Sequence, residues 1–97
     1  MSLTLSDGSD AELAALALAG RQDAYRELLA RHRESVFRLV RAATGDPHEA
    51  LDLTQETFVA AFAALRSYDR ERPFAVWVKR IALNKCRDWA RRRRVRA

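Results

Sequence analysis

The sequence predicts an all-α protein, a compact bundle of about four helices, one short and three longer, with no sheet. The 97 residues include only 3 Gly and 2 Pro, whereas a β-sandwich or barrel needs a turn about every 8–12 residues. Apolar residues recur at helical rather than alternating spacing. A lone cysteine, Cys86, excludes a disulfide scaffold. The length favours a single domain.

A short helix is expected near the N-terminus. Asp10 is a candidate N-cap, because its carboxylate can accept hydrogen bonds from the first free N–H groups of a helix. The helix should run through Ala19, and Gly20 should end it. Residues 1–9 are expected to form a flexible leader.

A second, longer helix is predicted from about Gln22 to Ala43. His32 lies within its apolar stripe, where a single histidine more often packs than binds a ligand. The stripe itself consists of Tyr25, Leu28, Leu29, Val36, Leu39, Val40 and Ala43.

The clearest helix boundary lies at Gly45-Asp46-Pro47-His48-Glu49. Glycine ends one helix, aspartate caps the next, proline suits its first position, and Glu49 has the spacing of a capping box. The third helix should run to about Leu65. Its expected core residues are Leu51, Phe58, Phe62 and Leu65, and its opposite face carries His48, Asp52, Gln55 and Glu56.

A loop is predicted over residues 66–73, since they are polar and Pro73 cannot lie inside a helix. The last helix should start at Pro73 or Phe74, continue through Trp89 and fray at 91–94. Its expected packing residues are Phe74, Trp77, Val78, Ile81 and either Leu83 or Cys86.

The net charge of +5 is unevenly distributed. Residues 1–65 carry six arginines and ten acids, a net of −4, whereas residues 66–97 carry twelve bases and three acids, a net of +9. All but Lys79 and Lys85 of these twelve bases are arginines, whose planar guanidinium groups suit phosphate and aromatic stacking. The last third therefore favours a polyanionic partner, with a merely solvated tail as the alternative.

Catalytic and metal chemistry is not expected. The sequence lacks phosphate-binding glycine motifs and zinc-ligand spacing. Asp52 and Glu56 form an i, i+4 carboxylate pair, but no second such pair occurs that a facing helix could supply. We therefore expect no enzyme activity and no cofactor. The absence of an apolar run of about 18 residues, of a signal peptide and of a second cysteine suggests a soluble, cytoplasmic protein with no membrane partner.

Two surfaces could bind partners. On the third helix, the helix dipole accounts for acids in the first turns, but Gln55 and Glu56 lie deeper and need either solvation or a partner. Such a partner would be a basic protein surface that docks on this face. On the last helix, a polar-basic stripe places one amide among guanidinium groups, a combination that can read a base edge while holding the DNA backbone. This stripe consists of Arg80, Asn84, Arg87 and Arg91. The alternative is an ordinary exposed Asn84, with Arg91–Arg94 complementing the helix C-terminus.

The preceding loop carries Tyr68, Arg70 and Arg72, groups that can hold an unstacked base, although most such loops are connectors. Trp77 and Trp89 are residues that more often pack in a core than stack on bases.

Several short segments occur in a fixed order, and together they are specific where each alone is weak. They are Ala24-Tyr25-Arg26-Glu27-Leu28-Leu29, Asp52-Leu53-Thr54-Gln55-Glu56-Thr57-Phe58, Ala64-Leu65-Arg66-Ser67-Tyr68, Phe74-Ala75-Val76-Trp77-Val78-Lys79-Arg80-Ile81-Ala82-Leu83-Asn84, and Arg87-Asp88-Trp89 before an arginine run. The ordered set closely resembles region 2 of the extracytoplasmic-function (ECF) sigma factors, small promoter-recognition subunits of bacterial RNA polymerase.

The resemblance implies docking on core polymerase, and recognition and melting of the promoter minus-ten element with the non-template strand bound. The implied contacts to the polymerase clamp coiled coil are Asp52, Gln55 and Glu56. The implied base pocket is the segment Tyr68 to Phe74. The family pattern leaves two roles for Trp77, which either packs in the core or wedges the duplex open. The implied DNA contacts are Tyr68, Arg70, Arg72, Phe74, Trp77, Lys79, Arg80, Asn84, Arg87 and Arg91.

Family members carry a second helical domain, region 4, and this chain ends before it. The implied layout is a leader over 1–9, region 2 over 10–94 and a tail over 95–97, in either an excised domain or a natural truncation. The family also implies an anti-sigma factor as a partner, although no residue of this sequence indicates that partner directly. From the residues alone, two alternatives stay open: a sequence-independent nucleic-acid-binding module, and a protein-interaction module whose basic tail binds an acidic partner.

Overall fold

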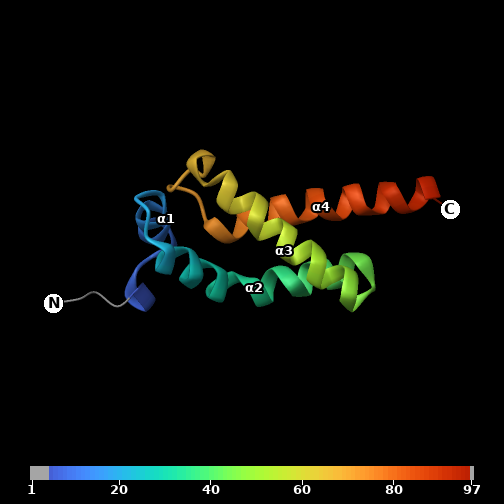
Figure 1. Ribbon diagram of the computed structural model, residues 1–97, viewed down its shortest axis with the longest axis horizontal. Coiled ribbons are helices and arrows are strands. Elements are labelled where there is room, and N and C mark those ends of the chain that lie inside the picture. Colours follow the sequence, from blue (N-terminus) through green and yellow to red (C-terminus); the bar gives the residue numbers. More distant parts are fainter. Residues whose placement is uncertain (1–4, 97) are drawn as a thin grey trace.

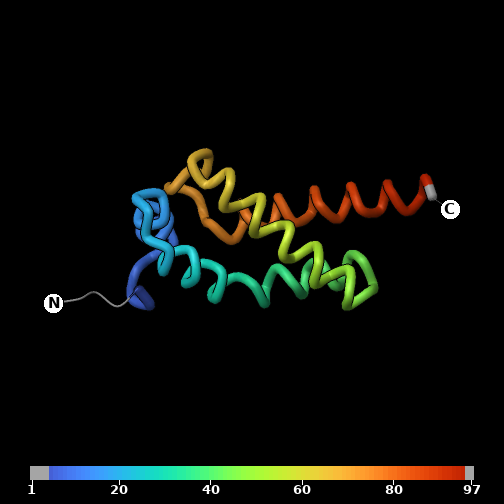
Figure 2. Tube along the Cα trace, in the orientation of Figure 1, coloured from blue at the N-terminus to red at the C-terminus, as the bar shows by residue number. Residues whose placement is uncertain are grey.

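The computed structural model describes residues 5–96 and contains, over that range, four α-helices and no strand. The chain runs out along one long helix, back along the next and out again along the last (Figure 1; Figure 2). The expected all-α bundle is confirmed. The elements are η1 (Leu5–Asp7), α1 (Asp10–Leu18), α2 (Gln22–Thr44), α3 (Pro47–Ala63), η2 (Leu65–Ser67) and α4 (Phe74–Arg96).

The first helix is capped by Ser9 rather than by Asp10. The Ser9 hydroxyl accepts from the Glu12 N–H at 3.1 Å, and the Glu12 carboxylate accepts from the Ser9 N–H at 3.2 Å, a reciprocal capping box. The expected cap was wrong because two consecutive residues could fill that role, and only Ser9 has the extended backbone of a cap. Asp10 is thereby left to face α2.

At the boundary between α2 and α3, the predicted glycine end and aspartate cap both form. Gly45 adopts a left-handed conformation with φ of 72°, and the Asp46 carboxylate accepts from the His48 and Glu49 N–H groups at 2.9 and 3.3 Å. These backbone hydrogen bonds lower the pKa of Asp46. Glu49 was expected to complete a capping box, but its side chain instead accepts from Trp89 on α4.

The core is shared by all four helices, since α1 packs against α2, and α2, α3 and α4 pack against one another. Leu51 was expected to face this core but is 55% exposed, and Leu53 is buried in its place. Because α3 contacts two helices, a wide arc of its surface is buried, and the centre of that arc lies away from Leu51. The buried residues of α3 are Ala50, Leu53, Thr54, Thr57, Phe58 and Ala61.

The other core expectations on the long helices are mostly met. On α2, Leu28, Val36 and Val40 are buried, whereas Ala43, which follows the last buried residue of the helix, is exposed. On α4, Cys86 is buried and Leu83 is exposed, which decides between the two alternatives.

The ends of the chain also depart from expectation. Of the segment expected to be a flexible leader, residues 1–4 lie outside the described residues, while Leu5–Asp7 form a 3-10 turn. Arg31 holds this turn by donating to the Leu5 and Ser6 carbonyls at 3.1 and 3.0 Å. At the other end, α4 continues to Arg96, past the expected fraying, and Ala97 lies outside the described residues.

No helix within residues 5–96 is long and apolar enough to cross a membrane.

Candidate nucleic-acid interface

The loop between η2 and α4 is closed by its own hydrogen bonds. The Asp69 carboxylate accepts from the Glu71 N–H at 3.0 Å, and the Asp69 carbonyl accepts from the Arg72 N–H at 3.0 Å. The Tyr68 hydroxyl donates to the Arg72 carbonyl across the loop. Arg70 and Arg72 are exposed, and Arg72 lies 3.5 Å from the Asp69 carboxylate. The loop thus presents two guanidinium groups on a backbone of defined shape.

Three aromatic rings form a cluster beneath this loop. Tyr68 contacts Phe74 edge-on, with ring centroids 5.3 Å apart, and both rings lie within 5.6 Å of Trp77. Phe74 is 1% exposed, so its expected role as a DNA contact does not fit this conformation; the ring fills the core where α4 begins. Tyr68 is 7% exposed, and burial raises the pKa of its phenol. Trp77 is half-buried and packs against the core.

The outer face of α4 carries the expected polar-basic stripe. Arg80, Asn84 and Arg87 are exposed, and among the described residues no acidic side chain forms an ion pair with either arginine. Arg91 is also exposed and lies 3.3 Å from Asp88. Lys79 is half-buried at the edge of this face. Within the described residues, the stripe therefore joins one amide to two guanidinium groups without an acidic partner, Arg80 and Arg87, and to a third, Arg91, that is paired with Asp88.

The C-terminal half of α4 is fixed to the start of α3. The indole of Trp89 donates to the Glu49 carboxylate at 3.1 Å, and the Arg93 guanidinium lies 5.0 Å from the centre of the Trp89 ring. Beyond this contact α4 projects past the other helices (Figure 1). Arg91–Arg94 are exposed on the projecting part.

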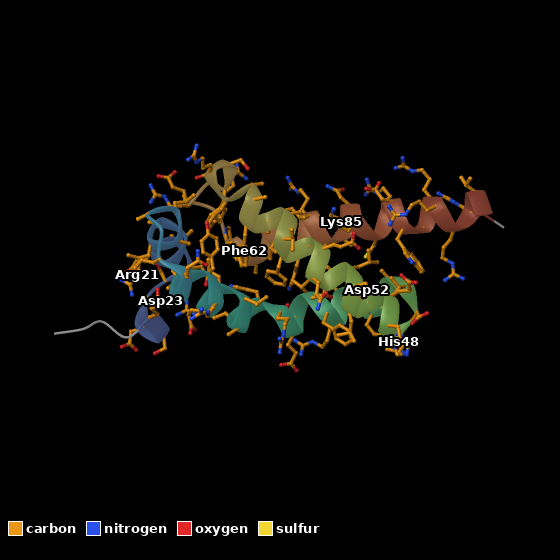
Figure 3. All side chains as sticks on the ribbon, viewed as in Figure 1. Arg21, Asp23, His48, Asp52, Phe62 and Lys85 are labelled. Carbon is orange, nitrogen blue, oxygen red and sulfur yellow. The ribbon has the colours of Figure 1, made fainter. Side chains whose placement is uncertain are left out.

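The acidic face of α3 is a second surface. Asp52, Gln55 and Glu56 are all exposed and line one groove of about 600 Å³ between α3 and α4. Lys85 of α4 lines the same groove, a residue that the sequence did not single out; Figure 3 shows Asp52 and Lys85 on these two neighbouring helices.

An apolar groove of about 790 Å³ between α2 and α3 adjoins the acidic face. Gln55 and Val59 line both grooves, and Leu51 lines the apolar one. Val59 is 71% exposed. The spacing of Leu51, Gln55 and Val59 at i, i+4 and i+8 is the signal that could have identified this apolar border from the sequence.

No group of three or more histidine, cysteine or acidic side chains that could hold a metal ion occurs within the described part of the chain.

The part of the chain that carries the long helices, the loop and the basic stripe matches a known protein family. The family model described as Sigma-70 region 2 matches residues 28–96. The chain belongs to the sigma-70 region 2 family.

Relatives of this region 2 chain include sigma factors of the ECF group. The sigma factor CnrH of Cupriavidus metallidurans is 43% identical over 90 residues, which cover 93% of this chain and 47% of CnrH. The ECF sigma factor SigW of Bacillus subtilis is 33% identical over 75 residues, 77% of this chain and 40% of SigW. The chain thus spans about half the length of the curated relatives it matches. Sigma factors are transcription proteins rather than enzymes.

Two solved structures of sigma factors share the fold of this region 2 chain. An engineered region 2 of sigmaE, solved in complex with GTAAAA, superposes with a TM-score of 0.85 at 30% identity and covers 99% of this chain and 97% of that one. CnrH in complex with the cytosolic domain of CnrY has a TM-score of 0.75 at 43% identity and covers 81% of this chain and 51% of CnrH. The resemblance to ECF sigma region 2 is confirmed.

Proposed function

We propose that this chain is the promoter-reading domain of an RNA polymerase sigma factor. It docks on core polymerase, recognises and melts the minus-ten element during transcription initiation, and binds the non-template strand. The observation that carries the proposal is the stripe of Arg80, Asn84 and Arg87 on α4, in a chain that belongs to the sigma-70 region 2 family. The sigmaE relative solved with GTAAAA supports the same assignment.

The stripe and the loop have different roles in strand binding. Arg80, Arg87 and Arg91 hold successive phosphates, while the Asn84 amide reads a base edge. Arg70 and Arg72 on the loop, with the half-buried Trp77 beneath, receive a base that has left the duplex. Stacking provides roughly 1–3 kcal/mol per base, which together with the phosphate contacts acts against an unstacking cost of a few kcal/mol. Melting then follows from contacts that exist only with the opened strand.

The acidic face provides the docking surface. Asp52, Gln55 and Glu56 line one groove and complement a basic helix surface, which we assign to the clamp coiled coil of core polymerase. The apolar border formed by Leu51 and Val59 adds area that a bound helix can bury. Docking on α3 leaves the basic stripe of α4 available to DNA.

The protein acts in the bacterial cytoplasm, where polymerase acts. Residues 10–94 form the functional unit. An anti-sigma factor is a further proposed partner. The complex of the relative CnrH with the cytosolic domain of CnrY supports a protein partner of this kind.

Selection from a pool of single strands with six randomised positions tests strand recognition. The wild-type chain should enrich a defined sequence, and Asn84→Ala should lose that preference while retaining binding that weakens with salt. Enrichment of no sequence, with or without core polymerase, would instead support a sequence-independent nucleic-acid-binding module. The exposed run Arg91–Arg94 is the feature that such a module would use.

A further inference from the structure

The Asp10 carboxylate of the first helix is bonded to two side chains of α2 near the loop 68–73. The Asp10 carboxylate accepts from His32 Nε2 at 2.9 Å and from Arg31 at 3.2 Å. A carboxylate can only accept, so the bond to His32 places a proton on Nε2 of the imidazole. Because Ser9 caps α1, Asp10 is free to hold α2 instead. Asp10 thereby fixes the orientation of the His32 ring.

The His32 ring in turn contacts the aromatic cluster beneath the loop. Its centroid lies 5.0 Å from that of Phe74, at an interplanar angle of 47°. Phe74 then contacts both Tyr68 and Trp77. A continuous series of contacts therefore leads from α1 to the two ends of the loop.

Two further observations connect α1 with the loop. Helix α1 packs directly against η2, the turn that leads into Tyr68. Burial raises the pKa of Tyr68, and the nearby Asp10 and Asp69 carboxylates raise it further. Asp10 is thus close enough to act on the Tyr68 phenol electrostatically.

We propose that Asp10 and His32 are positioning residues for strand recognition: they hold Phe74, and through it the loop 68–73, in the shape that receives an unstacked base. The inference rests on the proposed function. Neither residue has to touch DNA. Asp10 precedes the first residue that the family model matches, Leu28, so the match itself assigns α1 no role.

The physical advantage of such positioning is preorganisation. A loop that is already ordered loses less conformational entropy when a base binds, and a site performs best when a surrounding shell of contacts fixes its geometry. The His32 side chain is only 13% exposed, so the ring has little freedom to move while Asp10 holds it. Loss of either the hydrogen bond or the ring should loosen the loop without removing a phosphate contact.

The test compares substitutions at His32 and Asp10 with a matched core control. The variants are His32→Ala, His32→Phe, Asp10→Ala and Asp10→Asn. Val40→Ala serves as the control, because Val40 is buried in the same helix towards its other end, away from the loop. The full 97-residue chain is used throughout, with the strand most enriched from the randomised pool and a scrambled strand of the same composition.

His32→Ala and Asp10→Ala should lower the preference for the enriched strand about tenfold, within the range expected for residues that act through others. The salt dependence should stay unchanged, because no phosphate contact is lost. Asp10→Asn should restore the preference, since its amide oxygen still accepts from His32, and His32→Phe should fall between. Val40→Ala should lower stability and leave the preference unchanged.

Amide hydrogen exchange provides a readout that needs no DNA. The N–H groups of Glu71 and Arg72, both bonded to Asp69, should exchange faster in His32→Ala than in Val40→Ala. Equal exchange and equal strand preference in these two variants would overturn the inference and leave the proposed function intact. A wild-type chain that enriches no strand would overturn both.

Discussion

Glu49 accepts a hydrogen bond from the indole N–H of Trp89 at 3.1 Å, across 40 positions of the sequence. The bond joins the first turn of α3 to α4, and so connects the proposed docking helix with the proposed strand-binding helix. Beyond it only the projecting end of α4 remains, with Arg91–Arg94 exposed. The bond therefore adds to the packing of α4 against α2 and α3 that sets the position of this basic segment relative to the docking face.

Trp89→Phe should lower the free energy of unfolding by about 1–3 kcal/mol, since it removes a hydrogen bond to a charged group and part of a packed ring. Urea unfolding followed by circular dichroism measures the change. Glu49→Gln is the matched control, because its amide oxygen still accepts from the indole. Equal losses in the two variants would show that the hydrogen bond does not stabilise the junction.

Asn84→Ala and Arg87→Ala should have different effects, because one side chain reads bases and the other holds phosphate. Asn84→Ala should abolish discrimination between the enriched and scrambled strands and leave the salt slope unchanged. Arg87→Ala should weaken all strands about threefold to tenfold and reduce the salt slope by about 0.7–1. Fluorescence anisotropy at several salt concentrations separates the two. The assignment of roles is wrong if both variants behave alike.

Reversal of one charge on the acidic face should disrupt docking. Asp52→Arg should weaken capture by immobilised core polymerase about 100-fold, because it places like charges together, and Gln55→Ala should weaken it less. Asp23→Arg is a suitable control, since Asp23 is on α2, at the opposite end of the molecule from Asp52 (Figure 3). If Asp52→Arg binds polymerase as the wild type does, the acidic face is not the docking surface.

The Asp46 cap should make stability depend on pH in the acid range. Backbone hydrogen bonds from His48 and Glu49 lower the pKa of Asp46 below 3.8 in the folded state. The stability that the Asp46 cap contributes is therefore fully present above the pKa that Asp46 has in the unfolded state. It is lost as the pH falls through the pKa that Asp46 has in the folded state. Thermal unfolding from pH 7 down to pH 2 measures this loss, which should be smaller in Asp46→Asn, because the amide oxygen caps without titrating. Equal pH profiles in the wild type and the variant would contradict the assignment.

The sequence was most informative where backbone conformation is set by local chemistry. Gly45, Asp46 and Pro47 define the boundary between α2 and α3, because a left-handed residue, a capping carboxylate and a fixed φ leave few alternatives. The cap of α1 was assigned to Asp10 although Ser9 and Glu12 have the spacing of a capping box. That signal was present in the sequence and was missed.

Features that depend on how helices meet could not be read from one helix at a time. Leu51 fits the periodicity of a core position on α3, yet α3 packs between two helices and leaves it exposed. Lys85 joins the acidic groove only because α4 lies beside α3. The spacing predicts Phe74 as a packing residue, whereas the family resemblance implies Phe74 and Tyr68 as DNA contacts; both are buried, Phe74 against His32 and Tyr68 against Phe74. Such tertiary contacts join residues far apart in the sequence, which local spacing does not encode.

Strand binding in the presence of core polymerase tests the central proposal most directly. A labelled single strand enriched from the randomised pool, the 97-residue chain and core polymerase are mixed, and the affinity is compared with that of a scrambled strand. The account predicts tighter binding of the enriched strand when both proteins are present than with either alone, with the preference lost in Asn84→Ala and the complex lost in Asp52→Arg. Equal affinity of the wild-type complex for the enriched and scrambled strands would contradict it.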